Sequence, residues 1–220
     1  GVWLQPGSFI EAAGQAAAER AAEGTDEIAP DGDHAVHFNT TFVFDPAGDV
    51  VGRYRKVHLF DVDLPYTGVH ESRFFAPGDE AAVVDVDGVE VGLTICYDLR
   101  FPELFRIETL EGADLITMPS AFTARTGRDH WEPLLRTRAI ENQVYVVAPG
   151  QCCTSADGVA RHGHSLVIDP WGTVLADAGD EAGYVVADID LDLLERTRTR
   201  IPSVANRRPA SYRWPPDPRA

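Results

Sequence analysis

Short apolar stretches, each bounded by turn-forming residues, follow one another along most of the chain and predict β-strands. Residues 40–45 and 50–54 flank a Pro-Ala-Gly turn, and residues 81–86 and 89–96 flank an Asp-Gly turn, so each pair is expected to form a β-hairpin. Additional strands are expected at residues 114–120, 144–150, 163–169, 173–176 and 184–190.

Between these stretches lie segments with the composition or spacing of helices. Pro102 suits the first turn of one helix and Gly112 suits its end, while Asp129 is the candidate N-cap of the next. By contrast, residues 61–80 lack periodicity and carry two prolines, which is typical of a long loop. The expected helices are residues 11–23, the segment from 102 to 111, residues 128–143 and residues 191–199.

The order of these elements indicates a layered α/β (α+β) domain. Some strands arrive as hairpins and others alternate with helices, which predicts a mixed sheet covered by helices. No linker divides the chain, so residues 1–220 are expected to form a single domain. The Pro- and Arg-rich residues from about 199 to 220 are expected to form an extended C-terminal tail that lies on the domain or on a partner subunit.

The charge of the chain excludes two classes of partner. Its 35 acidic and 19 basic residues give a formal net charge of −16, which repels nucleic acid and anionic membranes. No run of about 18 apolar residues predicts a transmembrane helix. Of the basic residues 18 are Arg, and Lys56 is the only lysine. An acidic chain almost without lysine fits a high-salt, halophilic cytoplasm, where a retained lysine would have a task that Arg cannot perform.

The cysteines indicate a reducing compartment. The chain has three, Cys96, Cys152 and Cys153, and this small odd number argues against a disulfide scaffold and for the cytoplasm. The last two, together with His162 and His164, suggest a metal site at first sight. Adjacent cysteines lack the spacing of the usual Cys-x-x-Cys zinc ligands, so no metal is predicted.

Four residues could carry chemistry. Cys96 ends an apolar strand and precedes a helix, where a thiol can be exposed and the following amides can stabilise an oxyanion. The charge of Lys56 would favour a thiolate, and Glu71 in the long loop could orient the lysine or move protons. His130 could be the base of a Cys/His pair. The structural alternatives are a buried core cysteine, a solvated lysine, a solvated loop acid and a histidine packed at a helix start.

Two long motifs, YRKVHLFD at residues 54–61 and ICYDLRFPE at residues 95–103, make the chain resemble the nitrilase superfamily of carbon–nitrogen hydrolases. Further matching segments follow in the order of that family and cover most of the chain. They are residues 38–63, 71–79, 91–106, 119–132, 134–152 and 163–176. The resemblance implies a four-layer α-β-β-α sandwich, assembly into a homodimer or a higher homo-oligomer, and catalysis without a metal or organic cofactor.

The resemblance also implies roles for particular residues. Cys96 would be the nucleophile that attacks an amide carbonyl or a nitrile carbon, giving a thioester or a thioimidate. Lys56 and the backbone N–H of Tyr97 would stabilise the tetrahedral intermediate. A glutamate would act as general base and acid, and Glu71 matches an additional loop glutamate of the family beside the lysine.

Within the superfamily, residues 163–176 and 200–212 look most like the amidase branch that contains omega-amidase and deaminated-glutathione amidase. This likeness implies that the substrate is a small carboxylated molecule with a terminal amide. An Arg near the pocket is therefore expected, with Arg100, Arg125 and Arg128 as candidates, although Arg100 could instead be a structural ion-pair partner. The expected substrate-binding residues are Arg100, Phe122, Arg125, Thr126 and His130.

One part of the family pattern does not match. The general-base glutamate should stand well upstream of Lys56 in a Pro-Glu context, yet no Pro-Glu pair precedes Lys56. The opening residues resemble the middle of the family domain, so we expect a domain truncated at its N-terminus that hydrolyses its substrate poorly or not at all. The alternatives are a nitrilase acting on nitriles, a catalytically silent binding domain, and a papain-type Cys/His hydrolase that depends on His130.

Overall fold

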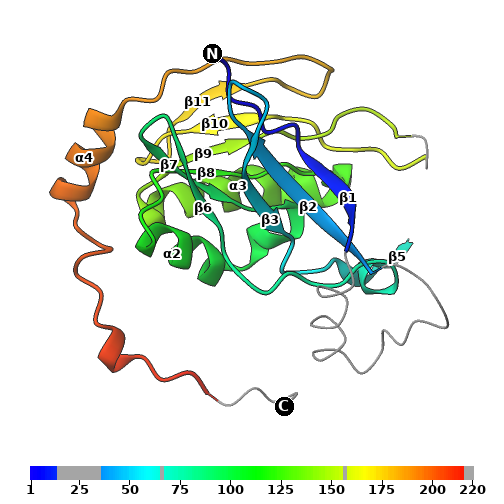
Figure 1. The fold of residues 1–220 in the computed structure, drawn as a ribbon, viewed down its shortest axis with the longest axis horizontal. Coiled ribbons are helices and arrows are strands. Elements are labelled where there is room, and N and C mark those ends of the chain that lie inside the picture. Colours follow the sequence, from blue (N-terminus) through cyan, green and yellow to red (C-terminus); the bar gives the residue numbers. More distant parts are fainter. Residues whose placement is uncertain (14–35, 65–66, 156–157, 216–220) are drawn as a thin grey trace.

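A computed structural model describes residues 1–13, 36–64, 67–155 and 158–215 of the protein (Figure 1). The largest sheet has the strand order β11-β10-β9-β8-β7-β6, with β7, β8 and β9 parallel and the outer pairs antiparallel. Its strands are β6 (Val83–Val86), β7 (Val89–Leu93), β8 (Leu115–Thr117), β9 (Tyr145–Ala148), β10 (Leu166–Ile168) and β11 (Val174–Asp177).

A second, smaller sheet precedes the large one in the chain. Its three strands are antiparallel and lie in the order β1-β2-β3, with β1 at Ser8–Ala12, β2 at His37–Phe44 and β3 at Val50–Arg55. A short hairpin follows, formed by β4 (Asp61–Leu64) and β5 (Thr67–His70). This hairpin carries the chain from the small sheet toward the first strand of the large one.

Helices connect the parallel strands and cover one face of the large sheet. Helix α2 (Pro102–Leu110) runs between β7 and β8, and helix α3 (Ala124–Asn142) runs between β8 and β9. Both helices lie on the face of the sheet opposite to β1, β2 and β3 (Figure 1). A third helix, α4 (Leu191–Arg200), follows the last strand.

Two hydrophobic cores separate these layers, because successive side chains of a strand point to opposite faces. Ile116 and Val146 are fully buried against the helices, where they pack with Trp131 of α3. Leu115 and Tyr145, the neighbouring residues, belong to the core between the two sheets. The described residues thus form helix, sheet and sheet layers, which are three of the four layers of the α-β-β-α sandwich expected from the family resemblance.

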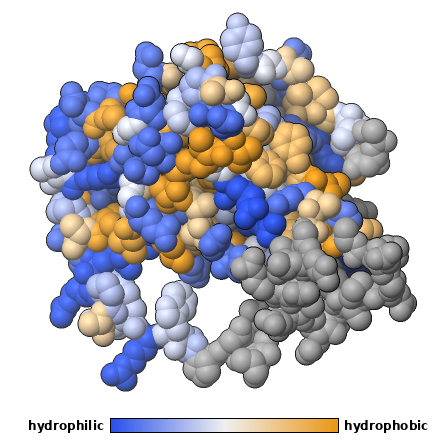
Figure 2. All heavy atoms as spheres, viewed as in Figure 1, coloured by the Kyte–Doolittle hydropathy of each residue, from blue (hydrophilic) through white to orange (hydrophobic). Residues whose placement is uncertain are grey.

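The surface mixes apolar and hydrophilic side chains on the face seen in Figure 2. Residues 201–215 are largely exposed and include one 3-10 turn at Pro209–Ser211. In the part of the chain that the structure describes, no helix combines the length and the apolar character needed to cross a membrane.

Most of the predicted elements are confirmed. The two predicted hairpins are β2–β3 and β6–β7, and the predicted strands within residues 114–120, 144–150, 163–169 and 173–176 are β8 to β11. Helix α2 begins at Pro102 and ends before Gly112, as its sequence indicates. Helix α4 covers the predicted segment from residue 191.

Two predictions about element boundaries are wrong. Helix α3 begins five residues before Asp129, because the side chain of Thr123 accepts the backbone N–H of Thr126 and caps the helix there. Residues 61–80 are not one long loop, since they contain the β4–β5 hairpin and a 3-10 turn at Glu71–Arg73. Aperiodic sequence hid this hairpin, which has only four residues in each strand.

Two other predictions are wrong because a segment forms a strand only where a neighbouring strand pairs with it. Glu11 and Ala12 belong to β1 rather than to a helix, because they pair with β2, while residues 14–23 lie outside the described part of the chain. Residues 184–190 form no strand. Strand β11 is the edge strand of the large sheet, and no described strand pairs with residues 184–190. Tyr184 and Val186 are exposed.

Candidate active site

Cys96 lies where strand β7 gives way to a short 3-10 helix, Cys96–Arg100. Its φ of +51° falls in the left-handed region, which residues other than glycine seldom adopt. Its backbone N–H donates a hydrogen bond of 3.0 Å to the carbonyl of Pro119, just beyond β8. The cysteine is therefore held at the carboxyl ends of parallel strands, where open α/β sheets bind their ligands.

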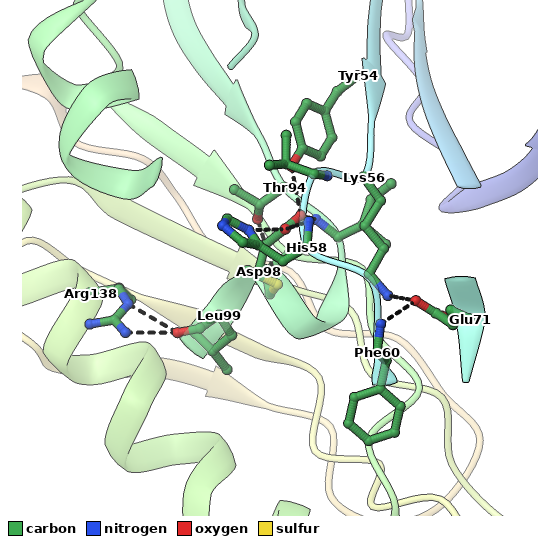
Figure 3. Close-up of polar contacts among 12 residues, drawn as sticks. Tyr54, Lys56, His58, Phe60, Glu71, Thr94, Asp98, Leu99 and Arg138 are labelled. Carbon is green, nitrogen blue, oxygen red and sulfur yellow. Dashed lines mark hydrogen bonds and ion pairs between the residues drawn. The ribbon is translucent and has the colours of Figure 1, made fainter. Parts of the chain in front are cut away.

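Lys56 follows strand β3 and points toward Glu71 (Figure 3). The lysine side chain is only 1% exposed, and its Nζ lies 2.5 Å from Oε2 of Glu71. The same carboxylate oxygen accepts the backbone N–H of Phe60 at 2.8 Å. Because an unpaired buried ammonium is costly, Glu71 both neutralises and orients the only lysine of the protein.

The carboxylate of Asp98 ties the 3-10 helix to the segment around Lys56 (Figure 3). Its Oδ2 accepts hydrogen bonds of 2.8 Å from the phenol of Tyr54 and from the backbone N–H of Ile95. Its Oδ1 accepts the backbone N–H of His58 at 3.2 Å and lies 2.8 Å from Nδ1 of that ring. Asp98 thus binds the residues two positions before and two positions after Lys56.

Helix α3 supports the same turn from the other side. Arg138 is buried, and its Nε and Nη2 donate to the carbonyl oxygen of Leu99 at 3.1 and 2.8 Å (Figure 3). Its Nη1 donates to Glu141 at 2.7 Å, which balances the charge. The 3-10 helix is therefore fixed by buried charged groups on both of its sides.

The electrostatic surroundings keep the thiol of Cys96 protonated at rest. Burial raises its pKa, while the positive charge of Lys56 and a hydrogen bond from the backbone N–H of Ala121 oppose that rise. The negative charges of Glu71 and Asp98 raise the pKa further. Attack by this sulfur therefore requires a group that accepts its proton.

Two adjoining cavities meet at Cys96, Glu71 and Ala121. The larger, about 580 Å³, reaches Lys56 and the backbone of residues 149–151. The smaller, about 280 Å³, is bounded in part by aromatic rings and arginines. Its walls include Phe60, Tyr97, Arg100, Phe122, Thr126 and Arg161.

The structure brings most of the predicted site residues to these cavities, but three candidates lie elsewhere. Arg125, Arg128 and His130 are exposed on α3 and line neither cavity. The Nδ1 of His130 lies 3.3 Å from Nη1 of Arg100, and the guanidinium of Arg100 lies over the ring of Phe122. His130 thus contacts Arg100, and no contact joins it to Cys96 within the described residues.

Sequence reasoning missed several residues that shape the site. Arg161 lines the smaller cavity, and its Nε donates to the hydroxyl of Ser155 at 3.0 Å. Its only sequence signal is its place just before the Gly-His-Ser segment at 163–165. Gly127 in the first turns of α3 packs against His162, where a Cβ atom would lie 2.2 Å from the ring. That glycine allows the loop carrying Arg161 to approach the helix.

Glu11, the glutamate upstream of Lys56 that the structure describes, lines neither cavity. Glu11 is held by Arg55, whose Nη2 and Nε donate to its two oxygens at 2.8 and 2.9 Å. This hydrogen bonding lowers the pKa of Glu11. The remaining upstream glutamates, at positions 19, 23 and 27, lie outside the described residues.

Comparisons with known proteins find relatives over most of the chain. The family model of the Carbon-nitrogen hydrolase matches residues 12–199. A deaminated glutathione amidase of Synechocystis is 45% identical over 174 residues, covering 77% of this chain and 64% of the relative. A deaminated glutathione amidase of Rattus norvegicus is 41% identical over 214 residues, covering 96% and 61%. The omega-amidase NIT2 of Homo sapiens is 42% identical over 184 residues, covering 83% and 67%.

A solved structure is similar to nearly the whole chain. The NitFhit protein of C. elegans superimposes with a TM-score of 0.82 at 37% identity, over 96% of this chain and 48% of the other. The chain spans 61% to 67% of the length of these three curated relatives.

Proposed function

Since the chain belongs to the carbon–nitrogen hydrolase family, we propose that its site hydrolyses the terminal amide of a small carboxylated compound to a carboxylate and ammonia. The observation that carries the proposal is the meeting of three groups around one cavity. The thiol of Cys96, the buried ammonium of Lys56 and the carboxylate of Glu71 all line the larger cavity. A nucleophile beside a fixed positive charge and a carboxylate suits acyl transfer.

In the first half of the reaction, the sulfur of Cys96 attacks the amide carbon and a C–S bond forms. The carbonyl oxygen becomes an oxyanion, which the ammonium of Lys56 and the backbone N–H of Tyr97 stabilise. The proton released by the thiol passes to the amide nitrogen through a carboxylate. The C–N bond then breaks, ammonia leaves, and a thioester remains on Cys96.

In the second half, water attacks the thioester carbon and the C–S bond breaks. A carboxylate takes a proton from the water, the acid product leaves, and the thiol of Cys96 is regenerated. Glu71 is the described carboxylate that touches both cavities and the lysine. The family resemblance assigns the proton transfers to a glutamate upstream of Lys56, so this step is the one the experiment must isolate.

The smaller cavity supports the choice of a carboxylated substrate. Arg100 and Arg161 both line it, and a guanidinium pairs well with a carboxylate. The rings of Phe60 and Phe122 suit the short apolar stem between the carboxylate and the amide. The names of the relatives, deaminated glutathione amidase and omega-amidase, support an amide in preference to a nitrile.

Ammonia release from succinamate, a four-carbon acid amide, tests the proposal. The wild-type chain is expected to release ammonia, and Cys96→Ala is expected to release none. Butyramide, which lacks the carboxylate, is the matched control, and Arg100→Met should slow succinamate hydrolysis while leaving butyramide unchanged. The nitrile analogue 3-cyanopropionate should release no ammonia.

Intact-mass measurement separates the remaining alternatives. An acyl adduct that forms on Cys96 without ammonia turnover beyond one equivalent would place the defect in the second half of the reaction. Neither adduct nor ammonia from any substrate would favour the catalytically silent binding domain. That reading is the second candidate, and it is supported by Glu11, a glutamate upstream of Lys56 that is bound to Arg55 and lines neither cavity.

We further propose that the protein is a cytoplasmic homodimer. All three cysteines are free thiols, which suits a reducing compartment. Large side chains in the C-terminal tail, including Tyr212 at 59% and Trp214 at 80% exposure, suit burial against a second copy. Light scattering after size-exclusion chromatography tests the assembly, and a mass of about 24 kDa would contradict it.

A further inference from the structure

Cys152 and Cys153 form a pair of thiols outside the site described above. Their Sγ atoms lie 3.2 Å apart, and neither is in a disulfide. Cys153 is exposed and Cys152 is half-buried, so solvent-borne reagents can reach the pair. The backbone of Cys153 has a φ of +65°, a left-handed conformation that brings the two neighbouring side chains to the same side.

The pair stands directly beside the wall of the larger cavity. Gln151, the preceding residue, lines that cavity, and its backbone N–H donates to the carbonyl of Ser120 at 2.9 Å. The carbonyl of Cys153 accepts the backbone N–H of Arg161 at 2.8 Å, and Arg161 lines the smaller cavity. The two thiols thus lie between Gln151, which lines the larger cavity, and the backbone hydrogen bond to Arg161, which lines the smaller one.

Two thiols at contact distance favour one reaction above others. After one sulfur forms a mixed disulfide, the second attacks it within the same molecule, at a high effective concentration. Adjacent residues have Cα atoms about 3.8 Å apart, below the usual range of about 4.4–6.8 Å for a disulfide. The resulting ring is strained, and strained, exposed disulfides are the readily reduced ones.

A metal explains the pair less well. Within the ranges that the structure describes, no group of three or more His, Cys, Asp or Glu side chains is arranged to hold a metal ion. The stacked rings of His162 and His164 face each other at 4.8 Å, and His164 is bound to Asp177. Two thiolates alone leave the usual four-coordinate zinc site incomplete.

We propose that Cys152 and Cys153 are a reversible oxidation site that small-molecule disulfides convert to a vicinal disulfide. The Cys153 thiolate, having lost its proton to solvent, attacks the small disulfide RSSR and expels one RS⁻. The Cys152 thiolate then attacks the Cys153 sulfur and expels the second RS⁻. The protein gives up two electrons, RSSR takes them, and two RSH form once the released protons are recaptured. This site does not depend on the hydrolase activity.

Peptide mapping after treatment with oxidised glutathione tests the proposal. Trypsin releases residues 139–161, which contain both cysteines, apart from residues 74–100, which contain Cys96. After blocking with iodoacetamide, the first peptide is expected to carry no alkyl group and to be lighter than its dithiol form by two hydrogens. Dithiothreitol should restore two alkylation sites, while Cys96 remains open to alkylation throughout.

The matched variants are Cys152→Ser and Cys153→Ser, each of which keeps one thiol of the pair. Each variant should accumulate the glutathione mixed disulfide, which the wild type converts to the vicinal disulfide. The proposal is overturned if iodoacetamide still alkylates both wild-type thiols after a glutathione treatment that forms the mixed disulfide on either variant. It is equally overturned by a stable glutathione mixed disulfide on the wild type, or by a disulfide that joins peptide 139–161 to peptide 74–100. Circular dichroism confirms that the variants fold.

Discussion

The phenol of Tyr54 donates a 2.8 Å hydrogen bond to the buried carboxylate of Asp98, joining strand β3 to the turn that begins at Cys96. The same phenol oxygen accepts the backbone N–H of Val57 at 3.2 Å. Burial and the charge of Asp98 raise the pKa of Tyr54, so its proton stays in this bond. The distance between the thiol and Lys56 is thus set by a hydrogen bond in which neither of them takes part.

Removal of this hydroxyl should weaken both the fold and the chemistry. Tyr54→Phe is expected to lower the free energy of unfolding by about 1.5–3 kcal/mol, since it removes a buried hydrogen bond to a charged group. Amide hydrolysis should fall in kcat more than in KM, because Lys56 is less well fixed. Urea denaturation and steady-state kinetics measure the two effects. Tyr184→Phe, at an exposed position, is the control and should change neither. Unchanged kcat in Tyr54→Phe would refute the link to the site.

Lys56 should control the reactivity of Cys96 even without substrate. Its charge lowers the pKa of the thiol against the effect of burial, so Lys56→Met should move the alkylation of Cys96 by iodoacetamide to higher pH. Amide hydrolysis should fall about 10²- to 10³-fold, as when a single oxyanion donor is lost. Arg53→Met, at an exposed position of strand β3 just before Lys56, is the matched control. The idea fails if the alkylation profiles of wild type and Lys56→Met coincide.

Glu108 on helix α2 should make the protein less stable as the pH rises. The residue is fully buried, and its carboxylate oxygens have no hydrogen-bond partner among the described residues. Burial, followed by the charge of Asp98, raises its pKa well above the usual range. The unfolded chain ionises this group near pH 4.3, so stability should fall above that pH by about 1.4 kcal/mol per unit until the folded-state pKa is reached.

Glu108→Gln, which stays neutral, should remove that part of the pH dependence. Urea denaturation between pH 5 and pH 8 should show the variant gaining on the wild type with each step toward higher pH. Glu103→Gln, exposed on the same helix, should follow the wild type. A constant difference between Glu108→Gln and the wild type across this range would mean that Glu108 is ionised in the folded protein.

Concentrated salt should stabilise the protein. A formal charge of −16 on 220 residues repels itself in the folded state. The Debye length falls from about 10 Å at 0.1 M salt to about 3 Å at 1 M, so this repulsion weakens as KCl is added. Thermal unfolding should therefore move to higher temperature with KCl, by about 2–4 °C for each kcal/mol gained. A melting temperature independent of KCl would argue against adaptation to high salt.

The sequence predicts the reactive residues of the site but not the residues that hold them in place. A strand-end cysteine and a solitary lysine point to Cys96 and Lys56, and the family resemblance of residues 71–79 points to Glu71. The structure brings all three to one cavity. The buried partners that fix them were not found. Asp98 binds Tyr54 across 44 positions of the sequence, a pairing that only the stacking of the two sheets creates.

Local patterns predicted elements well where a turn or cap announced them. The hairpin at Asp87-Gly88 and the helix start at Pro102 both follow simple stereochemical rules. The errors at Glu11 and at residues 184–190 have one cause, because strand formation depends on a partner that local sequence does not reveal. The start of α3 was misplaced because Thr123 and Asp129 are both good caps, and the fold uses the earlier one.

The contact between Gly127 and His162 limits how the smaller cavity can be redesigned. A variant library that varies the loop around Arg161 to accept bulkier amides would still have to fit that loop against α3. Any side chain at position 127 would collide with the imidazole, so the two positions must be exchanged as a unit. Libraries that randomise one of them alone would select for folding before they could select for a new substrate.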